Sequence, residues 1–251
     1  MKKGLALTAM CLGPVVQAGT LGASTFKVSP VRVTFAGPSS TLLTLKNESD
    51  QALRFQISSF AWTQDPKGAM GLTPTDDIVF FPALLSLNPG EERKVRVAAT
   101  VAAQDVEKTY RIFFEELPPL ETPGSPGANV RILTKMGIPI FVSPGKANVA
   151  ASIASISLEK GTLGFDVRNG GNVHFILERV KLQGFGANGE SLFDRQLDGW
   201  YVLAGSFRVY GAEIPAATCS KLKKIVIEAQ TDISGKSTII KEFEVSPALC
   251  R

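Results

Sequence analysis

The sequence predicts an all-β protein built from two sandwich domains. Apolar and polar residues alternate with a period of two in many short runs, and Gly, Pro, Asn and Asp separate those runs. No long stretch has the spacing of an amphipathic helix. The chain has 251 residues, of which 44% are hydrophobic, so two domains of ordinary size can each bury a core.

The first series of alternating runs predicts seven strands. The turn signal Asn88-Pro89-Gly90-Glu91 precedes the fifth of them, and Pro118-Pro119 ends the sixth. Seven short antiparallel strands in one unit are typical of an immunoglobulin-like sandwich. The strands are expected at Phe26–Phe35, Thr41–Asn47, Leu53–Trp62, Ile78–Phe81, Arg93–Ala99, Tyr110–Leu117 and Val130–Val142.

A break at Ser143-Pro144-Gly145-Lys146 separates this unit from a second series of runs. We therefore expect one domain over residues 24–145 and a second β-sandwich over 146–251. Strands of the second domain are expected at Val149–Leu158, Thr162–Val167, His174–Gln183, Ser191–Leu197, Gly205–Val209, Lys224–Glu228 and Ser237–Val245.

The first 23 residues have the features of a secretory signal peptide. Lys2 and Lys3 precede the apolar run Gly4–Val16, and Val16-Gln17-Ala18 places small residues where a signal peptidase cleaves. Cleavage is expected between residues 18 and 25, so the sequence predicts an exported protein.

Processing would also remove Cys11 and leave Cys219 and Cys250 as the two thiols. A pair of cysteines in an exported chain predicts one disulfide. A metal site would need further ligands, and the sequence does not supply them.

The charge distribution argues against a nucleic-acid partner. The chain carries 27 Lys and Arg against 23 Asp and Glu, and removal of the signal peptide brings the two totals closer. The densest basic cluster, at Lys221, Lys223 and Lys224, adjoins an apolar strand and does not form a run that could follow a phosphate backbone.

Catalytic constellations are missing from the sequence, so we expect a protein that is not an enzyme and uses no cofactor or small-molecule substrate. His174 is the single histidine and cannot form a Ser-His-Asp or multi-histidine site with a second one. The adjacent acidic pairs Asp76-Asp77 and Glu115-Glu116 would point to opposite faces of a strand. We expect a half-buried structural role for His174.

The most unusual predicted strand is Val130–Val142, which would span about 40 Å. Its alternate residues are apolar from one end to the other, and an exposed strand of this kind invites pairing with another chain. Either the strand closes the core of its own domain, or it serves to pair with a partner. The apolar row consists of Val130, Ile132, Thr134, Met136, Ile138, Ile140 and Val142.

Five segments, taken together and in order, resemble the periplasmic chaperones of the chaperone–usher pathway, in particular its archaic branch. The likeness covers nearly all of residues 26–145 and is looser beyond. The segments are Ser29-Pro30-Val31-Arg32-Val33-Thr34-Phe35, Thr44-Leu45-Lys46-Asn47, Leu87-Asn88-Pro89-Gly90, Tyr110-Arg111-Ile112-Phe113-Phe114-Glu115-Glu116-Leu117-Pro118-Pro119 and Ile140-Phe141-Val142-Ser143-Pro144.

This resemblance implies two immunoglobulin-like domains set as a boomerang in a periplasmic protein. It also implies fimbrial or pilus subunits and an outer-membrane usher as partners. The chaperone would lend its long strand to an incomplete subunit, whose groove its alternate side chains would fill. By match to the family, these side chains are Val130, Ile132, Thr134 and Met136.

Members of the family hold the carboxylate at the C-terminus of the subunit with an arginine and a lysine. Arg32 matches the arginine, whereas the lysine position aligns to Pro139, which carries no charge. Arg111 and Lys135 are the two candidates for the second cation, and Arg111 is favoured because it looks like the arginine of the archaic branch.

A charge cluster between the two domains is also implied by the family, and here it is incomplete. Glu107 and Asp232 match its acidic members, but Ser143 stands where its basic member would be.

An alternative interpretation is that the chain is a secreted immunoglobulin-like binding module or a subunit of a surface structure. In that case the long strand would close its own core. A subunit would usually carry a donor extension of alternating apolar residues, and residues 19–25 do not have that pattern. The sequence leaves open which subunit is bound and whether the free protein self-associates.

Overall fold

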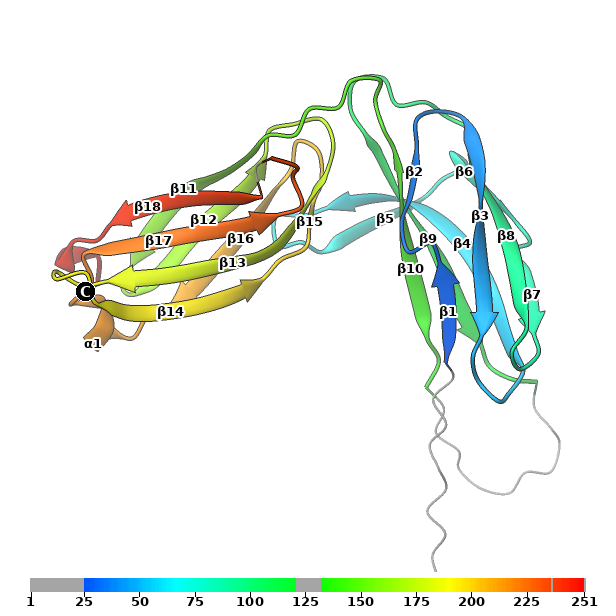
Figure 1. Cartoon of the computed structure of the whole chain (residues 1–251), viewed down its shortest axis with the longest axis horizontal. Coiled ribbons are helices and arrows are strands. Elements are labelled where there is room, and N and C mark those ends of the chain that lie inside the picture. The colour runs from blue at the N-terminus through cyan, green and yellow to red at the C-terminus, as the bar shows by residue number, and fades with distance from the viewer. Residues whose placement is uncertain (1–24, 121–131, 236, 251) are drawn as a thin grey trace, which may run out of the picture.

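A computed structural model describes residues 25–120, 132–235 and 237–250. Two β-sandwiches meet at an elbow, so that the chain has the shape of a boomerang (Figure 1). The fold is the predicted one, with two immunoglobulin-like domains made almost entirely of strands. Within the described ranges, no helix is long and apolar enough to cross a membrane.

The N-terminal sandwich consists of two sheets that enclose one core. The first has the order β1-β3-β8-β6, and the second has the order β2-β10-β9-β4-β5, with β7 paired to β4. The strands are β1 (Phe26–Ser29), β2 (Val33–Phe35), β3 (Ser39–Asn47), β4 (Leu53–Gln64), β5 (Met70–Pro74), β6 (Ile78–Phe81), β7 (Leu84–Leu87), β8 (Glu92–Ala99), β9 (Lys108–Leu117) and β10 (Lys135–Val142).

The C-terminal sandwich pairs the sheet β11-β12-β16 with the sheet β14-β13-β17-β18, and β15 is paired to β13. Two short helices lie near its far end (Figure 1). The elements are β11 (Ala151–Glu159), β12 (Thr162–Asn169), β13 (Phe175–Phe185), β14 (Ser191–Asp198), β15 (Tyr201–Val202), β16 (Phe207–Glu213), α1 (Ala216–Cys219), β17 (Lys224–Thr231), β18 (Thr238–Glu244) and the 3-10 helix η1 (Pro247–Cys250).

The prediction of one strand over Phe26–Phe35 is wrong. Phe26 and Val28 occupy even positions whereas Val33 and Phe35 occupy odd ones, yet all four are buried in the same core. One regular strand would place the two pairs on opposite faces. The chain therefore breaks after Ser29, and it joins β3 before the break and β10 after it.

The prediction of one strand over Val130–Val142 is also wrong in its N-terminal part. β10 begins at Lys135, Ile132 and Thr134 precede it, and Val130 lies outside the described residues. One backbone hydrogen bond, from Glu116 N–H to the Thr134 carbonyl at 2.9 Å, continues the pairing with β9 beyond the strand. Farther out, the side chain of Ile132 is 64% exposed, so no core holds the chain there.

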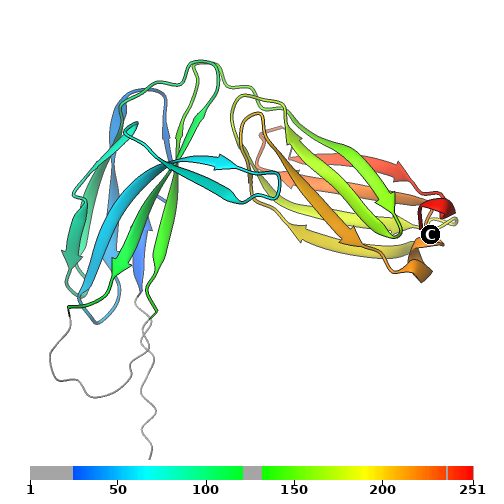
Figure 2. The same cartoon turned by 180° about the vertical axis from the view of Figure 1, so that it is seen from behind.

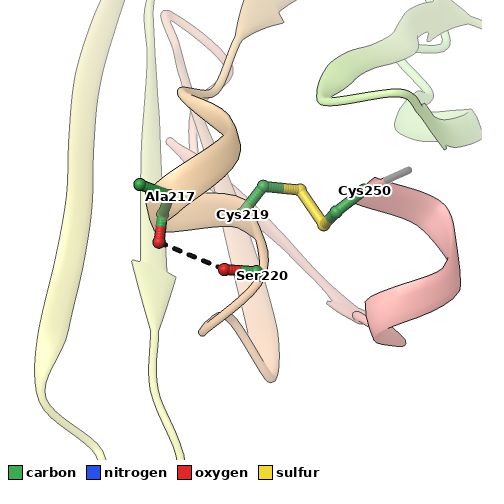
Figure 3. Close-up of a disulfide and its surroundings, with 4 residues drawn as sticks. All are labelled: Ala217, Cys219, Ser220 and Cys250. Atoms are coloured by element: carbon green, nitrogen blue, oxygen red, sulfur yellow. Dashed lines mark hydrogen bonds between the residues drawn. A yellow bond between two sulfur atoms is a disulfide. The ribbon is translucent and has the colours of Figure 1, made fainter.

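The expected disulfide between Cys219 and Cys250 is present and ties α1 to η1 (Figure 3). The two Cα atoms are 5.7 Å apart, which lies within the usual range for a disulfide. Cys219 is fully buried. The bond therefore anchors the C-terminal segment to the core of the second sandwich.

Replacement of both cysteines by alanine should lower the free energy of unfolding by about 3–4 kcal/mol. The physical reason is that the bond closes a loop with a sequence separation of 31 residues and so restricts the unfolded chain. Urea unfolding followed by circular dichroism measures the difference. The wild-type protein in the presence of a reductant is the control and should match the double variant. A loss below about 1 kcal/mol would contradict the prediction.

Candidate functional site

The two sandwiches are joined by hydrogen bonds around Glu107 and Asn172. The Glu107 N–H donates to the Asn172 carbonyl at 2.9 Å. The Glu107 carboxylate accepts from the backbone N–H of His174 at 2.9 Å and lies 2.6 Å from its Nδ1. Glu107 is buried, so these contacts satisfy an acidic group that would otherwise be costly to bury. His174 therefore takes part in the domain contact and has the half-buried structural position expected of it.

Asp232 also lies at the junction. Its carboxylate accepts a hydrogen bond from the backbone N–H of Ile176 at 2.7 Å, and it lies 3.9 Å from a guanidinium nitrogen of Arg32. Arg32 follows β1 in the N-terminal domain, so the pair spans the two domains. Both side chains are partly exposed, and an ion pair of this kind contributes little to stability.

The β4–β5 hairpin makes a further contact between the domains. Its tip reaches the C-terminal sandwich, where the N–H of Val209 on β16 donates to the carbonyl of Pro66 at 2.8 Å (Figures 1 and 2). Gly68 at the tip has φ +86°, and a Cβ there would lie 2.6 Å from the side chain of Arg208. The hairpin thus depends on glycine at this position for its backbone conformation, since Arg208 is a flexible side chain that could move aside.

An aromatic cluster fills the junction between these contacts. Trp62 from β4 and Phe141 from β10 pack with Tyr201 and Leu203 of the C-terminal domain. The imidazole of His174 stacks on Phe141 with ring centroids 3.6 Å apart. Trp62 and Phe141 are almost fully buried, so this cluster is a small core shared by both domains.

Arg111 lies beside this cluster on the face of β9 that points away from the N-terminal core. Its neighbours Tyr110 and Ile112 belong to that core, so alternation turns Arg111 outward. The side chain is nonetheless only 6% exposed, because aromatic rings cover it. Its Cζ is 4.1 Å from the ring centroid of Trp62, 5.6 Å from that of Tyr201 and 5.7 Å from that of Trp200.

The guanidinium of Arg111 keeps hydrogen-bond donors free. Nη1 donates to the carbonyl of Gly137 at 3.3 Å, whereas Nε and Nη2 are buried without a partner. Burial lowers the pKa of Arg111, but the ordinary value of arginine is so high that the group stays charged near neutral pH. In the part of the chain that the structure describes, no carboxylate forms an ion pair with it. A buried cation with free donors can bind an incoming carboxylate.

Lys135, the other candidate cation, is already paired. Its Nζ lies 2.7 Å from the carboxylate of Glu115, directly across the ladder, and both side chains are about half exposed. Of the three cations named from the sequence, Arg32 and Lys135 each have an acidic neighbour, and Arg111 has none among the described residues. The position of Arg111 is therefore the most favourable for a new anion.

Pro139 lies directly opposite Arg111 in the ladder between β10 and β9. The N–H of Glu116 donates to the carbonyl of Thr134, which has an even number. Because hydrogen-bonded pairs alternate along an antiparallel ladder, the even residues of β10 form the hydrogen bonds to β9. Pro139 has an odd number, so the N–H that proline lacks would not have formed a hydrogen bond to β9. Pro139, the position expected to align to the family lysine, thus lies across the sheet from the cation Arg111.

The edge of β10 is open along much of its length. On one side the strand pairs with β9 throughout, but on the other side it meets β2 only over Ile140–Val142. Among the described residues, the outer edge of Lys135–Pro139 pairs with no strand. Such an edge can accept a strand from another chain.

The apolar row along β10 changes its environment at this edge. Ile138, Ile140 and Val142 are buried in the N-terminal core, whereas Met136 and Thr134 are half-buried and Ile132 is exposed. The row therefore closes its own core at one end and leaves that core at the other. The first of the two roles considered for the strand, closure of its own core, applies to its C-terminal half.

The aromatic residues around Arg111 were not identified from the sequence. For Trp62 a signal was present: it occupies an even position in a strand whose core residues Leu53, Phe55 and Ile57 are odd, so alternation turns it away from the N-terminal core. For Trp200, which precedes a strand of two residues, no local pattern was available.

Fold and site together define a class of protein: two immunoglobulin-like domains at an angle, an edge strand open to a partner and a buried arginine at the junction. Residues 25–148 match the family described as the pili and flagellar-assembly chaperone, PapD N-terminal domain. Through this domain the chain belongs to the pili and flagellar-assembly chaperones. No curated protein matches the sequence closely.

Solved structures support the two-domain fold at low sequence identity. The chaperone–tip adhesion subunit complex CsuC–CsuE, from archaic chaperone-usher Csu pili of Acinetobacter baumannii, matches with a TM-score of 0.58 and 20% identity over 87% of this chain and 97% of that one. The class 5 fimbriae chaperone CfaA has a TM-score of 0.55 and 13% identity over 88% and 100% of the two chains. The CupB2 chaperone of Pseudomonas aeruginosa has a TM-score of 0.53 and 15% identity over 88% of this chain and 100% of that one.

Proposed function

We propose that this protein is a periplasmic chaperone that binds a fimbrial or pilus subunit, completes its fold with the segment leading into β10, and delivers it to an outer-membrane usher. The observation that carries the proposal is the open edge of β10, where an apolar row leaves the core of its own domain. Shape and hydrogen bonding supply the activity, and no catalytic group or cofactor is required.

The open edge gives the subunit a backbone to pair with. Since the even residues of β10 bond to β9, the N–H and C=O groups of Lys135 and Gly137 and the C=O group of Pro139 point to the free side. A subunit strand placed there would form main-chain hydrogen bonds with Lys135 and its odd neighbours. The side chains of Ile132, Thr134 and Met136 would then fill the groove of the subunit, together with Val130.

Arg111 provides the charge that holds the C-terminal carboxylate of the subunit. Its unpaired Nε and Nη2 suit a carboxylate, and its burial strengthens the bond because little water competes. Arg32, which is in the same domain as Arg111, would act as the second contact after leaving Asp232 of the C-terminal domain. Lys135 would serve a solubilising role at the edge, since it is held by Glu115.

The solved relatives agree with a subunit as the partner. CsuC is described in a pre-assembly complex with the tip adhesion subunit CsuE, and the SafB chaperone of Salmonella enterica in a complex with the pilin SafA. The SafB complex has a TM-score of 0.51 to this chain and 14% identity over 88% and 96% of the two chains. By analogy, the partner of this chain is a subunit of a surface fibre.

Co-purification from the periplasm tests the proposal. Candidate subunits are expressed with the wild-type chain, with Ile132→Asp and with Phe81→Asp. Ile132 is 64% exposed and Phe81 is 77% exposed on β6 in the other sheet, so neither variant should disturb folding. We expect wild type and Phe81→Asp to form a one-to-one complex, and Ile132→Asp to lose it because a carboxylate would enter an apolar groove.

Survival of the complex with Ile132→Asp would refute strand donation by this segment. The alternative of a secreted immunoglobulin-like module would then take precedence. Failure of both Asp variants would instead point to a general loss of folding, which circular dichroism of the purified chains would detect.

A further inference from the structure

We propose that the C-terminal domain forms part of the carboxylate anchor, with Trp200 and Tyr201 as positioning residues for Arg111. This inference rests on the proposed function, in which Arg111 binds the carboxylate of the subunit. It assigns a role in ligand binding to side chains of the C-terminal domain. The observation behind it is that Cζ of Arg111 lies within 6 Å of ring centroids from both domains, Trp62 of the N-terminal domain and Trp200 and Tyr201 of the C-terminal domain.

The backbone of the C-terminal domain fixes these two rings. The carbonyl of Trp200 accepts from the N–H of Leu177 at 2.9 Å, and Tyr201 pairs with Ile176 on β13. A Cβ on Gly199 would lie only 1.7 Å from the carbonyl oxygen of Leu177, so glycine is required for this close approach. Trp200 also packs edge-to-face on Tyr201 with centroids 5.5 Å apart. The pair is therefore held as a unit.

Aromatic rings can stabilise the guanidinium in a way that a carboxylate of the same chain could not. A ring face attracts the cation through its quadrupole and takes none of the N–H donors. A carboxylate from the same chain would neutralise the charge and occupy the N–H donors of the guanidinium. In the structure, Nε and Nη2 stay without a partner although the side chain is buried. The rings thus keep Arg111 charged, oriented and free to bind.

Trp200 is the ring that can be removed with the least damage to the fold. Its side chain belongs to a residue that is 42% exposed, whereas Trp62 is 1% exposed and part of the shared core. Loss of Trp200 would admit water to the guanidinium and release one of its three contacts. The consequence should be weaker binding of a carboxylate, with no effect on a neutral ligand of the same shape.

The test uses the full-length mature chain and two small probes, N-acetyl-phenylalanine and its amide. Dissociation constants are measured by NMR from the Arg111 side-chain Nε–H resonance and the indole resonances of tryptophan. We expect wild type to bind the acid and to bind the amide at least ten times more weakly, because the amide removes the charge that pairs with Arg111. Trp200→Ala should weaken acid binding about fivefold, the factor that corresponds to about 1 kcal/mol of a cation–π contact, and leave amide binding unchanged.

Two further variants separate positioning from contact. Trp200→Phe keeps a ring face and should retain acid binding within about twofold. Phe81→Ala, which removes an exposed ring on β6, is the matched control and should behave as wild type. A fold comparison by circular dichroism accompanies each variant.

The outcomes distinguish this inference from the proposed function. If wild type does not prefer the acid, the carboxylate anchor itself is wrong. If wild type prefers the acid and Trp200→Ala preserves both affinities, the anchor stands and the role of Trp200 is refuted. An equal loss of acid and amide in Trp200→Ala would make the ring a contact surface for the ligand, which also overturns a positioning role.

Discussion

Replacement of Arg111 by alanine should weaken subunit binding at least about 100-fold. The guanidinium is buried, has two nitrogen atoms without partners and would form a charge-assisted pair with the carboxylate of the subunit. Removing one partner of a buried charge pair costs about 2–5 kcal/mol or more. Biolayer interferometry with the subunit that co-purifies with wild type measures the change.

Three comparisons make this result specific. Arg111→Lys keeps the charge without the fork and should recover only part of the affinity. Arg32→Ala removes a half-exposed cation that lies beside Asp232, so its cost should stay below about tenfold. Pro139→Lys added to Arg111→Ala returns a cation directly across the ladder and should restore binding in part. A greater loss with Arg32→Ala than with Arg111→Ala would make Arg32 the main anchor.

Replacement of Phe141 by alanine should lower the free energy of unfolding by about 3–5 kcal/mol. The ring is fully buried, stacks on His174, and lies within 5.8 Å of Tyr201 and 6.2 Å of Trp62 between ring centroids. Deletion of a buried aromatic side chain leaves a cavity in addition to the lost transfer free energy. Urea unfolding measures the loss, and small-angle X-ray scattering reports any change in the angle between the domains.

Leu84→Ala provides the control for this variant, since Leu84 is 64% exposed on β7. Its effect should stay within about 0.5 kcal/mol, as for most surface substitutions. A loss of less than about 1 kcal/mol in Phe141→Ala would mean that the hydrogen bonds around Glu107 hold the junction without help from the aromatic cluster.

Much of the fold follows from alternation, and the departures have identifiable causes. The buried residues change from even positions at Val28 to odd positions at Val33, and this change indicates that the first strand is interrupted. The prediction missed it because the residues on each side of the interruption alternate regularly. β5 was not predicted because all five of its residues are exposed, so neither face leaves an apolar signature. β10 begins later than predicted because the alternating pattern extends from Lys135 toward the N-terminus, whereas the buried core ends before it.

The site was less accessible from sequence than the fold. Arg111 was identified through the resemblance, yet its buried environment depends on Trp200, which lies far away in the chain and in the other domain. The pairing of Lys135 with Glu115 depends on the register between β9 and β10. Contacts that arise from register and domain packing leave no local pattern in one sequence.

The β4–β5 hairpin determines how many ways the two domains can move. A junction held only around Glu107 and Asn172 would keep a free axis of rotation, as a single hinge does. The bond between Pro66 and Val209 adds a fixed point away from that hinge, at the tip of an arm that starts inside the N-terminal sandwich (Figure 2). Together with the shared aromatic cluster, the two points restrict rotation of one domain against the other. The length of the hairpin therefore helps to determine the angle between the domains. Insertions or deletions at residues 65–69 would alter this angle while both cores stay unchanged.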